Sequence, residues 1–401
     1  MINLPERIKN IEVDAFDSFS GSLRQPAQYS FQYKGEQSVS LTMNIKEEPY
    51  NSGAIHPVFA QNLPEGYIRR FIFEKLERHA RVNDLYLLAL QQDKGIGHLS
   101  FRSEIKEQDV DQLSLSDILS WKGDESIFPE LLNKYYLGGF ASGVQPKVLL
   151  NNVKAVANQR DIIVKTFDDE YPLLTVNEFV CMSAAKAVGL NPPEFWLSDD
   201  LRTFVIQRFD KTEDGKLGVE DFSVLTGKEK YSGSYEVLLK AVSLYTKDPE
   251  EVKRAYRYIV FNCLIGNGDA HLKNFAVQYS PDRSDIKLTP PYDITHTLVY
   301  PTIDNRMALK IGGAKSFPNK EVLIKLAEKE KIKGASDIIN EMAESIRDYL
   351  VQSDEVKLVE GLRESIESSL GNTCAASVLK QSYRHDKKRK YGGHDSSGIA
   401  R

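Results

Sequence analysis

The chain has 401 residues, of which 41% are hydrophobic and 27% charged, and its formal net charge is −5. This length suffices for two or three domains, and the charge gives no overall attraction to nucleic acid. No run approaches the roughly 18 apolar residues that span a bilayer, and no apolar stretch follows a basic start, so we expect a cytoplasmic protein without membrane contact. The three cysteines are too few and too scattered for a disulfide framework, and Cys181 and Cys263 lie on apolar helix faces as expected of core thiols.

The first segment, residues 1–110, is predicted to be a separate, β-rich domain. Alternating apolar and polar residues predict strands at 29–33 and 38–42. Helices are expected at 65–76 and 83–90, and Asn62-Leu-Pro-Glu-Gly66 stands before the first of them. No residue of this segment carries an obvious chemistry, so we interpret it as a packing or partner-binding domain.

Residues 111–210 are expected to begin with a helical linker, from Leu115 to Tyr136, and to continue as a small β-rich lobe. Several glycines and Ser142 follow in Gly138-Gly-Phe-Ala-Ser-Gly-Val-Gln145-Pro146-Lys147, just before a predicted strand. The backbone N–H groups of such a loop can face phosphate. A hairpin turn is the alternative, and for a glycine cluster alone it is the more common case.

A buried strand is predicted at 160–165, and it ends in Lys165. The N-lobe of a protein kinase presents its phosphate-pairing lysine in this way, although many lysines at strand ends only face water. The next helix begins with a capping-box pattern, Thr175-Val-Asn-Glu178. Glu178 is therefore either the ion-pair partner of Lys165 or only the box residue, and we favour the second interpretation. A further buried strand, 203–207, runs into a polar linker.

The most informative stretch is Phe261-Asn-Cys-Leu-Ile-Gly-Asn-Gly-Asp-Ala-His-Leu-Lys-Asn274. The helix before it is predicted to start at N-cap Asp248, and Gly266 and Gly268 are expected to end it with positive φ. Asp269 and Asn274 are five positions apart, as in the Asp-x-x-x-x-Asn loop of protein kinases. There the Asp accepts the proton of the attacking hydroxyl, and the Asn binds a metal on ATP.

A second acid, Asp293, follows a predicted hairpin with strands at 275–279 and 286–289. The hairpin brings Asp293 back beside the loop, where its carboxylate can complete a Mg²⁺ site. A single Asp is more often a cap or turn residue, but here the elements occur in kinase order. We therefore predict an α+β, two-lobed protein-kinase-like fold, with a mostly helical C-lobe in residues 211–370.

With these elements assigned, the chain resembles the HipA-type serine/threonine protein kinases, the toxins of bacterial HipBA toxin–antitoxin systems. The resemblance covers nearly the whole chain to about residue 370, and it includes the N-terminal strands and Asn62-Leu-Pro-Glu-Gly66. The motifs that carry it are Gly143-Val-Gln-Pro-Lys147, Ile163-Val-Lys165, Asn177-Glu178, Gly189-Leu-Asn-Pro-Pro193, Ile206-Gln-Arg-Phe-Asp210, Glu220-Asp-Phe222, Asp269-Ala-His-Leu-Lys-Asn274 and Thr289-Pro-Pro-Tyr-Asp-Ile294.

The resemblance implies an ATP- and Mg²⁺-dependent serine kinase that phosphorylates a translation component such as an aminoacyl-tRNA synthetase and arrests growth. It implies a HipB-like helix-turn-helix antitoxin as partner, through which DNA is contacted indirectly. By motif, Asp269 is the catalytic base, and Asn274 and Asp293 are Mg²⁺ ligands. The nucleotide-binding residues that it implies are Gly143, Val144, Gln145, Lys165, Gln207, Arg208, Phe209, His271 and Lys273, with 207–209 as the adenine hinge.

This chain departs from the family at one regulatory position. Relatives often carry an autophosphorylated serine where this chain has Phe140. Ser142, immediately before Gly143, is the hydroxyl that remains in the core of the loop, so it is the candidate autophosphorylation site here.

The polar, basic residues 371–401 are expected to form a disordered tail, with a minor contact to DNA as the alternative. Two other functions remain open: a non-catalytic corepressor of a DNA-binding antitoxin, and a small-molecule phosphotransferase. The presence of Lys165, Asp269, Asn274 and Asp293 together favours an active kinase over a corepressor, because a decayed kinase is expected to lose at least one of them.

Overall fold

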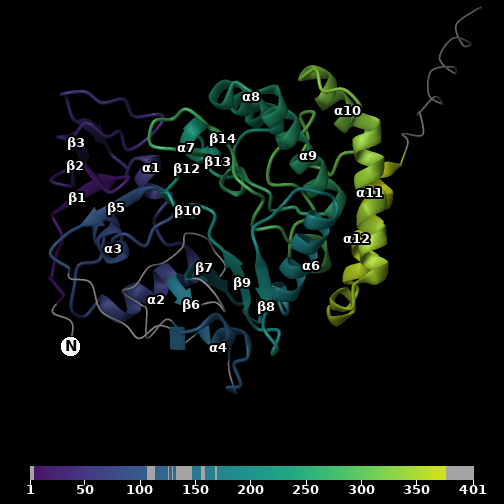
Figure 1. Cartoon of the computed structure of the whole chain (residues 1–401), viewed down its shortest axis with the longest axis horizontal. Helices are drawn as coiled ribbons and strands as arrows, with labels where there is room; N and C mark the ends of the chain where they lie inside the picture. Colours follow the sequence, from purple (N-terminus) through teal and green to yellow (C-terminus); the bar gives the residue numbers. More distant parts are fainter. Residues whose placement is uncertain are drawn as a thin grey trace, which may run out of the picture.

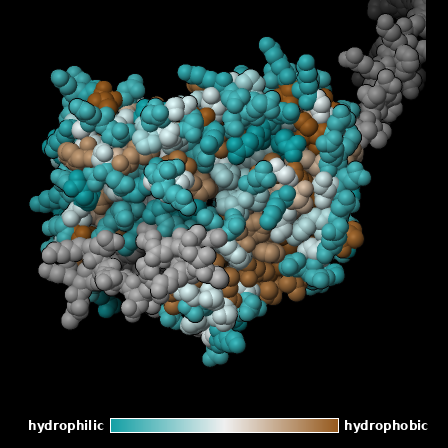
Figure 2. Space-filling model, in the orientation of Figure 1, coloured by the Kyte–Doolittle hydropathy of each residue, from teal (hydrophilic) through white to brown (hydrophobic). Residues whose placement is uncertain are grey.

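The computed structural model of the chain describes residues 4–105, 113–124, 126–128, 130–131, 147–154, 159–167 and 169–375. In Figure 1 the β-rich N-terminal part lies on the left, a small four-stranded sheet at the lower centre, and the helical part on the right. Figure 2 shows polar residues over most of this face, whereas apolar residues gather over the region of β8 and α6.

An antiparallel sheet forms the N-terminal part. Its order is β4-β3-β2-β1-β5, from β1 (Asn10–Ala15), β2 (Ser18–Arg24), β3 (Tyr29–Tyr33), β4 (Tyr50–Ser52) and β5 (Leu99–Arg102). Alternate residues of β1 (Ile11, Val13 and Ala15) are fully buried, as expected of a sheet with one face on a core. The accompanying helices are α1 (Pro57–Ala60), α2 (Gly66–Leu76) and α3 (Asp84–Gln91), of which α2 and α3 confirm the sequence prediction.

The strand predicted at 38–42 is wrong, because these residues form a loop. The hydroxyl of Ser40 and the N–H of Leu41 donate hydrogen bonds of 2.7 Å to the carboxylate of Glu220, 180 and 179 residues away. These polar groups of the loop are thus hydrogen-bonded to a residue far along the chain, and not to the backbone of a neighbouring strand.

The second sheet is antiparallel and has the order β6-β7-β9-β8. Its strands are β6 (Lys147–Lys154), β7 (Gln159–Lys165), β8 (Phe195–Leu197) and β9 (Phe204–Gln207). Successive side chains along its strands point to opposite faces of the sheet, as expected of strands. Ile162, Val164 and Val205 pack into the N-terminal core, together with Ile118 of α4 (Leu115–Leu119), while Phe204 and Ile206 pack into the helical core. The sheet therefore lies between two apolar cores, and both hold it in place.

The helical part surrounds a long buried helix, α9. Its helices are α6 (Leu174–Ala187), α7 (Phe222–Thr226), α8 (Tyr235–Thr246), α9 (Pro249–Ile265), α10 (Lys320–Lys329), α11 (Ala335–Gln352) and α12 (Leu362–Cys374), with 3₁₀ turns η1 (Leu272–Asn274), η2 (Thr297–Val299) and η3 (Glu355–Leu358). Three short strands, β12 (Gly218–Asp221), β13 (Ala276–Tyr279) and β14 (Lys287–Leu288), form an antiparallel sheet, and β10 (Lys211–Thr212) pairs with β11 (Gly215–Lys216). The hairpin predicted before Asp293 is therefore present as β13 and β14.

Both ends of α9 follow local rules. The side chain of Asp248 accepts a hydrogen bond of 2.9 Å from the N–H of Glu250, and Pro249 occupies the first turn. Gly266 ends the helix with φ +74°, as predicted. Gly268 does not have the positive φ that we expected. Its role is steric, because a Cβ there would lie 2.8 Å from Thr297 Oγ1 and 2.9 Å from the carbonyl oxygen of Arg306.

The capping box predicted for α6 is wrong. The helix begins at Leu174, its N-cap is Leu173 with φ +56°, and no side chain caps it. Thr175 instead donates a hydrogen bond of 2.6 Å to the carbonyl oxygen of Leu201, and Glu178 is fully buried within the protein. Both polar side chains thus serve tertiary contacts.

Buried charged groups join the N-terminal part to the remainder. Arg208 and Asp210 form an ion pair of 2.6 Å; Arg208 also donates to the carbonyl oxygens of Lys94 and Gly95, and Asp210 accepts from the N–H of Gly97. Glu220 accepts from Ser40 and Leu41 on one side and from Tyr279 on the other. Since a buried charge without partners is costly, these pairs oppose separation of the two parts.

Two further sequence expectations concern cysteines and membranes. Cys181 and Cys263 are buried thiols, as predicted, and burial raises the pKa of Cys263 to about 12. Among the described helices, none combines the length and the apolar character that crossing a membrane requires. The prediction of a disordered tail from residue 371 is wrong for residues 371–374, which belong to helix α12. Residues 376–401 lie outside the described residues.

Candidate active site

A cleft of about 890 Å³ opens where the second sheet, the loop after α9 and the start of α2 meet. Its walls include Lys165 from β7, Asp269 and Asn274 from the loop after α9, and Asp293 from the segment after β14. A cleft of this size lies in the range of small-molecule and nucleotide sites. The four residues that the sequence singled out therefore line one cavity, although they come from separate elements.

Lys165 stands between two carboxylates at the end of β7. Its Nζ lies 2.5 Å from Glu178 Oε1 and 2.6 Å from Asp293 Oδ1, and only 4% of its side chain is exposed. Burial alone would lower the pKa of this lysine, but the charges of Asp293 and Glu178 outweigh burial and raise it. Lys165 is thus held as a cation. Our preference for Glu178 as only a helix-cap residue was wrong, because the carboxylate is the ion-pair partner.

Asn274 and Asp293 converge, as the kinase spacing predicted. The Asn274 amide donates to the backbone oxygen of Asp293 at 3.2 Å and to its Oδ2 at 3.3 Å. Asp293 has φ +59°, a left-handed conformation that residues other than glycine rarely adopt. Tyr258 supports this segment by donating a hydrogen bond of 3.0 Å to the carbonyl oxygen of Tyr292. The backbone thus carries strain where the carboxylate enters the cleft.

The donor set of this pair fits a magnesium ion. Within the described residues, Asn274 Oδ1 is buried and has no hydrogen-bond partner. An amide oxygen and a carboxylate are ligands that Mg²⁺ accepts, and Mg²⁺ usually takes one or two protein carboxylates together with waters and substrate phosphates. The described part of the chain contains no group of three His, Cys, Asp or Glu side chains suited to a metal. Asn274 and Asp293 would therefore hold the ion together with waters or substrate phosphates.

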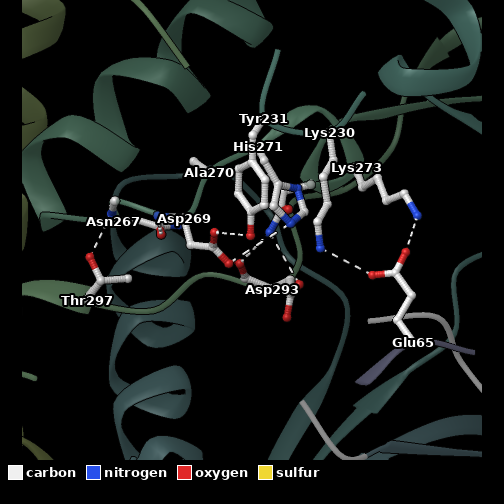
Figure 3. Close-up of polar contacts among 12 residues, drawn as sticks. Glu65, Lys230, Tyr231, Asn267, Asp269, Ala270, His271, Lys273, Asp293 and Thr297 are labelled. Atoms are coloured by element: carbon white, nitrogen blue, oxygen red, sulfur yellow. Dashed lines mark hydrogen bonds and ion pairs between the residues drawn. The ribbon is translucent and has the colours of Figure 1, made fainter. Parts of the chain in front are cut away.

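Asp269 lies in the loop after α9, and Figure 3 shows its carboxylate directed toward Tyr231. Its Oδ1 accepts a hydrogen bond of 3.1 Å from the Tyr231 hydroxyl, and its Oδ2 lies 4.0 Å from His271 Nε2. The walls of the cleft partly desolvate this carboxylate, although 55% of the side chain is still accessible to solvent. This desolvation and the nearby charge of Asp293 raise the pKa of Asp269 to about 6. At pH 7 the carboxylate is still mostly ionised and can accept a proton.

His271 and Lys273 both enter the cleft, as the resemblance implied. The ring of His271 packs edge-on against Tyr231, and burial lowers its pKa to about 4, so it is neutral at pH 7. Lys273 is held by a residue that the sequence analysis did not single out. Its Nζ lies 2.5 Å from Glu65 Oε1, and Lys230 Nζ lies 3.2 Å from Glu65 Oε2.

The predicted hinge also lines the cleft, at the end of β9. Phe209 stacks on Tyr292 with ring centroids 5.9 Å apart. Arg208 differs from its neighbours, because its buried guanidinium bonds Asp210 and the carbonyl oxygen of Gly95. Its side chain is therefore committed to the contact with the N-terminal part, and its backbone N–H donates a hydrogen bond of 2.9 Å to the carbonyl oxygen of Asp161. The candidate loop residues Ser142, Gly143, Val144 and Gln145 lie outside the described residues.

Three site residues were missed: Glu65, Lys230 and Tyr231. Glu65 belongs to the Asn62-Leu-Pro-Glu-Gly66 motif, which we had noted only as part of the resemblance. Lys230 and Tyr231 lie in the connection between α7 and α8, where the sequence shows no periodic pattern. No local signal connects these residues to Asp269, and their contacts span 38 to 208 positions along the chain.

Two family models and several known proteins match the chain. The family model of the HipA-like C-terminal domain matches residues 139–350, and the family model of the HipA N-terminal domain matches residues 11–102. Y4dM, an inferred kinase of Sinorhizobium fredii, is 28% identical over 333 residues, which are 74% of this chain and 78% of that protein. The serine/threonine-protein kinase toxin HipA of Shewanella oneidensis is 26% identical over 200 residues, 42% of this chain and 46% of the toxin.

Among solved structures, that of Shewanella oneidensis HipA with HipB and operator DNA is similar in fold. It matches with a TM-score of 0.67 and 18% identity, over 90% of this chain and 96% of its own. The match confirms the predicted α+β, two-lobed kinase-like fold with a β-rich N-terminal domain.

Proposed function

Because the chain belongs to the HipA family, we propose that it is an ATP- and Mg²⁺-dependent serine/threonine protein kinase. The observation that carries the proposal is the meeting of Lys165, Asp269, Asn274 and Asp293 in one cleft of nucleotide size. These residue types are those that a protein kinase uses for its phosphate-pairing lysine, its base and its two metal ligands.

In this proposal Asp269 is the general base. It would accept the proton of a serine or threonine hydroxyl as the hydroxyl oxygen attacks the terminal phosphorus of ATP and ADP leaves. Its pKa of about 6 suits this role, because the group is deprotonated at neutral pH and yet basic enough to take a proton. His271, neutral and packed on Tyr231, adds no positive charge beside it.

Lys165 would bind the phosphates of ATP, and Glu178 keeps it charged and in place. Asn274 and Asp293 would hold Mg²⁺, which neutralises phosphate charge when it is bound. The backbone of Gln207, Arg208 and Phe209 would receive the adenine, beside the ring pair of Phe209 and Tyr292. By family resemblance, Gly143, Val144 and Gln145, which lie outside the described residues, would complete the nucleotide site.

We extend the proposal to the biological role. The chain would act as the toxin of a toxin–antitoxin system, phosphorylating a translation component such as an aminoacyl-tRNA synthetase and arresting growth. A HipB-like helix-turn-helix antitoxin would neutralise it and provide its contact with DNA. The support is family membership and the likeness to a solved chain whose structure is described as a complex of HipA, HipB and operator DNA.

The proposal is tested by incubating the protein with labelled ATP, Mg²⁺ and a whole-cell lysate and by identifying the labelled protein. We expect Asp269→Asn to lower transfer by a factor on the order of 10²–10⁴, which is typical for loss of a positioned base. Asp214→Asn, in the exposed turn between β10 and β11, is the matched control and should transfer at the wild-type rate.

Three results would contradict parts of the proposal. Wild-type transfer by Asp269→Asn would remove that residue as the base. Labelling of a metabolite but of no protein would indicate a small-molecule phosphotransferase. Absence of any transfer, with antitoxin and operator binding intact, would indicate a non-catalytic corepressor.

A further inference from the structure

Glu65 extends from the N-terminal domain into the cleft and lies between two lysines of the helical part. Figure 3 shows its carboxylate between Lys230 and Lys273. The contacts measure 3.2 Å to Lys230 and 2.5 Å to Lys273, and they join residues 165 and 208 positions apart. All three side chains are between 22% and 27% exposed. The triad is thus a largely enclosed feature of the cleft.

The residues that precede Glu65 are firmly anchored in the protein. Asn62, Leu63 and Pro64 are buried. Gln61 donates a hydrogen bond of 2.9 Å to the carbonyl oxygen of Val219 and accepts one of 3.3 Å from the N–H of Asp221, so it is bound to β12. Glu65 is also the N-cap residue of α2, but its side chain makes no capping bond. The carboxylate therefore does not serve its own helix, and among the described residues it binds Lys230 and Lys273.

The two lysines stand beside the proposed catalytic groups. Lys273 immediately precedes Asn274, and its carbonyl oxygen accepts a hydrogen bond of 2.9 Å from Tyr292. Lys230 immediately precedes Tyr231, the residue that bonds Asp269. Although partial burial favours the neutral acid, the two lysines lower the pKa of Glu65, so that it is ionised at neutral pH. The triad thus connects the N-terminal domain to the loop that holds Asp269 and to the connection between α7 and α8.

We propose that Glu65 is a positioning residue through which the N-terminal domain sets the places of Lys230 and Lys273 for phosphoryl transfer. This inference rests on the proposed kinase function. A free lysine side chain loses rotamer entropy when it is ordered. An anchored carboxylate orders both lysines before the substrate arrives, and cations placed in advance stabilise the charge of the transition state most effectively. The N-terminal domain then completes the active site, beyond packing or partner binding.

The first test is the isosteric variant Glu65→Gln in the full-length chain. We expect kcat to fall on the order of tenfold to a hundredfold, as for slight misplacement of catalytic groups. The affinity for Mg-ADP, measured by calorimetry, should be unchanged or higher, because a negative charge near the phosphates is removed. The matched control is Glu74→Gln on the exposed side of the same helix, for which we expect wild-type kcat. Wild-type kcat in Glu65→Gln would overturn the inference.

A double-mutant cycle shows whether Glu65 acts through Lys273. If it does, the loss of kcat in Glu65→Gln combined with Lys273→Gln should be smaller than the sum of the two single losses, whereas fully additive losses would contradict the proposal. If Glu65→Gln melts at a lower temperature than wild type, the variant Glu65→Asp shows whether the loss of kcat comes from the lost carboxylate or from lost stability. This variant keeps the charge, and it should recover most of the kcat. A fully stable Glu65→Asp enzyme with no recovery would overturn the inference.

A third measurement does not depend on phosphoryl transfer. Acylation of amines, followed by mass spectrometry, should modify Lys230 and Lys273 several times faster in Glu65→Gln than in wild type or Glu74→Gln, because the ion pairs no longer occupy the amines. Equal rates in all three proteins would overturn the positioning role. Absence of transfer by the wild type would count against the kinase function instead, so the two failures are distinguishable.

Discussion

The hydroxyl of Tyr231 donates a hydrogen bond of 3.1 Å to Oδ1 of Asp269, 38 residues further along the chain. The same ring packs edge-on against His271, and Lys230 Nζ lies 5.0 Å from its centroid. The proposed base is therefore held on one oxygen by a residue from the connection between α7 and α8. Its other oxygen, 4.0 Å from His271 Nε2, remains available to an acceptor hydroxyl.

Removal of this hydrogen bond should change the pH dependence of catalysis. Burial and Asp293 raise the pKa of Asp269 to about 6, and the Tyr231 bond opposes them. A base works when it is deprotonated, so wild-type kcat/KM should be constant above this pKa and fall as the pH drops below about 6. In Tyr231→Phe the pKa of the base rises, and the fall should begin at a higher pH. The measurement is the profile of kcat/KM between pH 5 and 8.

The control for this profile is Tyr245→Phe, which removes a hydroxyl bonded to the carbonyl oxygen of Leu225 and which lies outside the cleft. Its profile should superimpose on the wild-type profile. An unshifted profile in Tyr231→Phe would show that the hydroxyl does not act on the titrating base.

The second prediction concerns the metal. Asp293→Ala should lose Mg²⁺-dependent binding of ATP, measured by calorimetry with and without Mg²⁺. The fold should survive, because Lys165 keeps Glu178 at 2.5 Å and is not left as an unpaired buried cation. If the variant binds Mg-ATP as tightly as the wild type, Asp293 is a structural residue and the metal site lies elsewhere.

The third prediction concerns stability. Arg208 and Asp210 have side chains no more than 2% exposed, and removal of one partner of such a pair typically costs about 3–5 kcal/mol. Asp210→Asn should lower the free energy of unfolding at pH 7 by a comparable amount, measured by urea denaturation. Asp214→Asn, exposed in the nearby turn, should leave it unchanged.

The pH dependence of this effect has a definite sign. Burial would raise the pKa of Asp210, but Arg208 and the N–H of Gly97 outweigh it and bring the pKa below its ordinary value. The carboxylate then contributes its full stability above its unfolded pKa of about 3.9, and this contribution is lost as the pH falls through the folded pKa. The deficit of Asp210→Asn should be largest near neutral pH and shrink in acid. A deficit independent of pH would contradict the ion-pair explanation.

The fourth prediction concerns Ser142, which lies outside the described residues. We propose that it is autophosphorylated and that the modification switches the kinase off, since a phosphate adds about −1.5 to −2 charges to a loop proposed to face ATP. Mass spectrometry of protein expressed alone should find the phosphate, and Ser142→Ala should stay active for longer. An unmodified Ser142 after prolonged incubation with Mg-ATP, together with equal toxicity of Ser142→Ala, would eliminate the proposal.

The sequence by itself determined the elements that carry the proposed chemistry. The two ends of α9 are set by Asp248, Pro249 and Gly266, because helix ends depend on residues close to them in sequence. The hairpin of β13 and β14 depends likewise on alternation and a short turn. With both elements placed, the five-residue spacing of Asp269 and Asn274 and the return of Asp293 predicted the meeting of Asn274 and Asp293 that the structure shows.

Only the tertiary structure decided which partner each polar side chain takes. Glu178 matched a capping box in sequence, yet it bonds Lys165, because folding brings β7 against α6 and a buried lysine requires a carboxylate. Glu65 showed no chemistry in sequence, yet it lies between Lys230 and Lys273. Local patterns reflect interactions over a few residues, whereas ion pairs form between whichever charged groups the packed cores bring within about 3 Å. The proposed active-site role of the N-terminal domain is therefore a property of the folded chain.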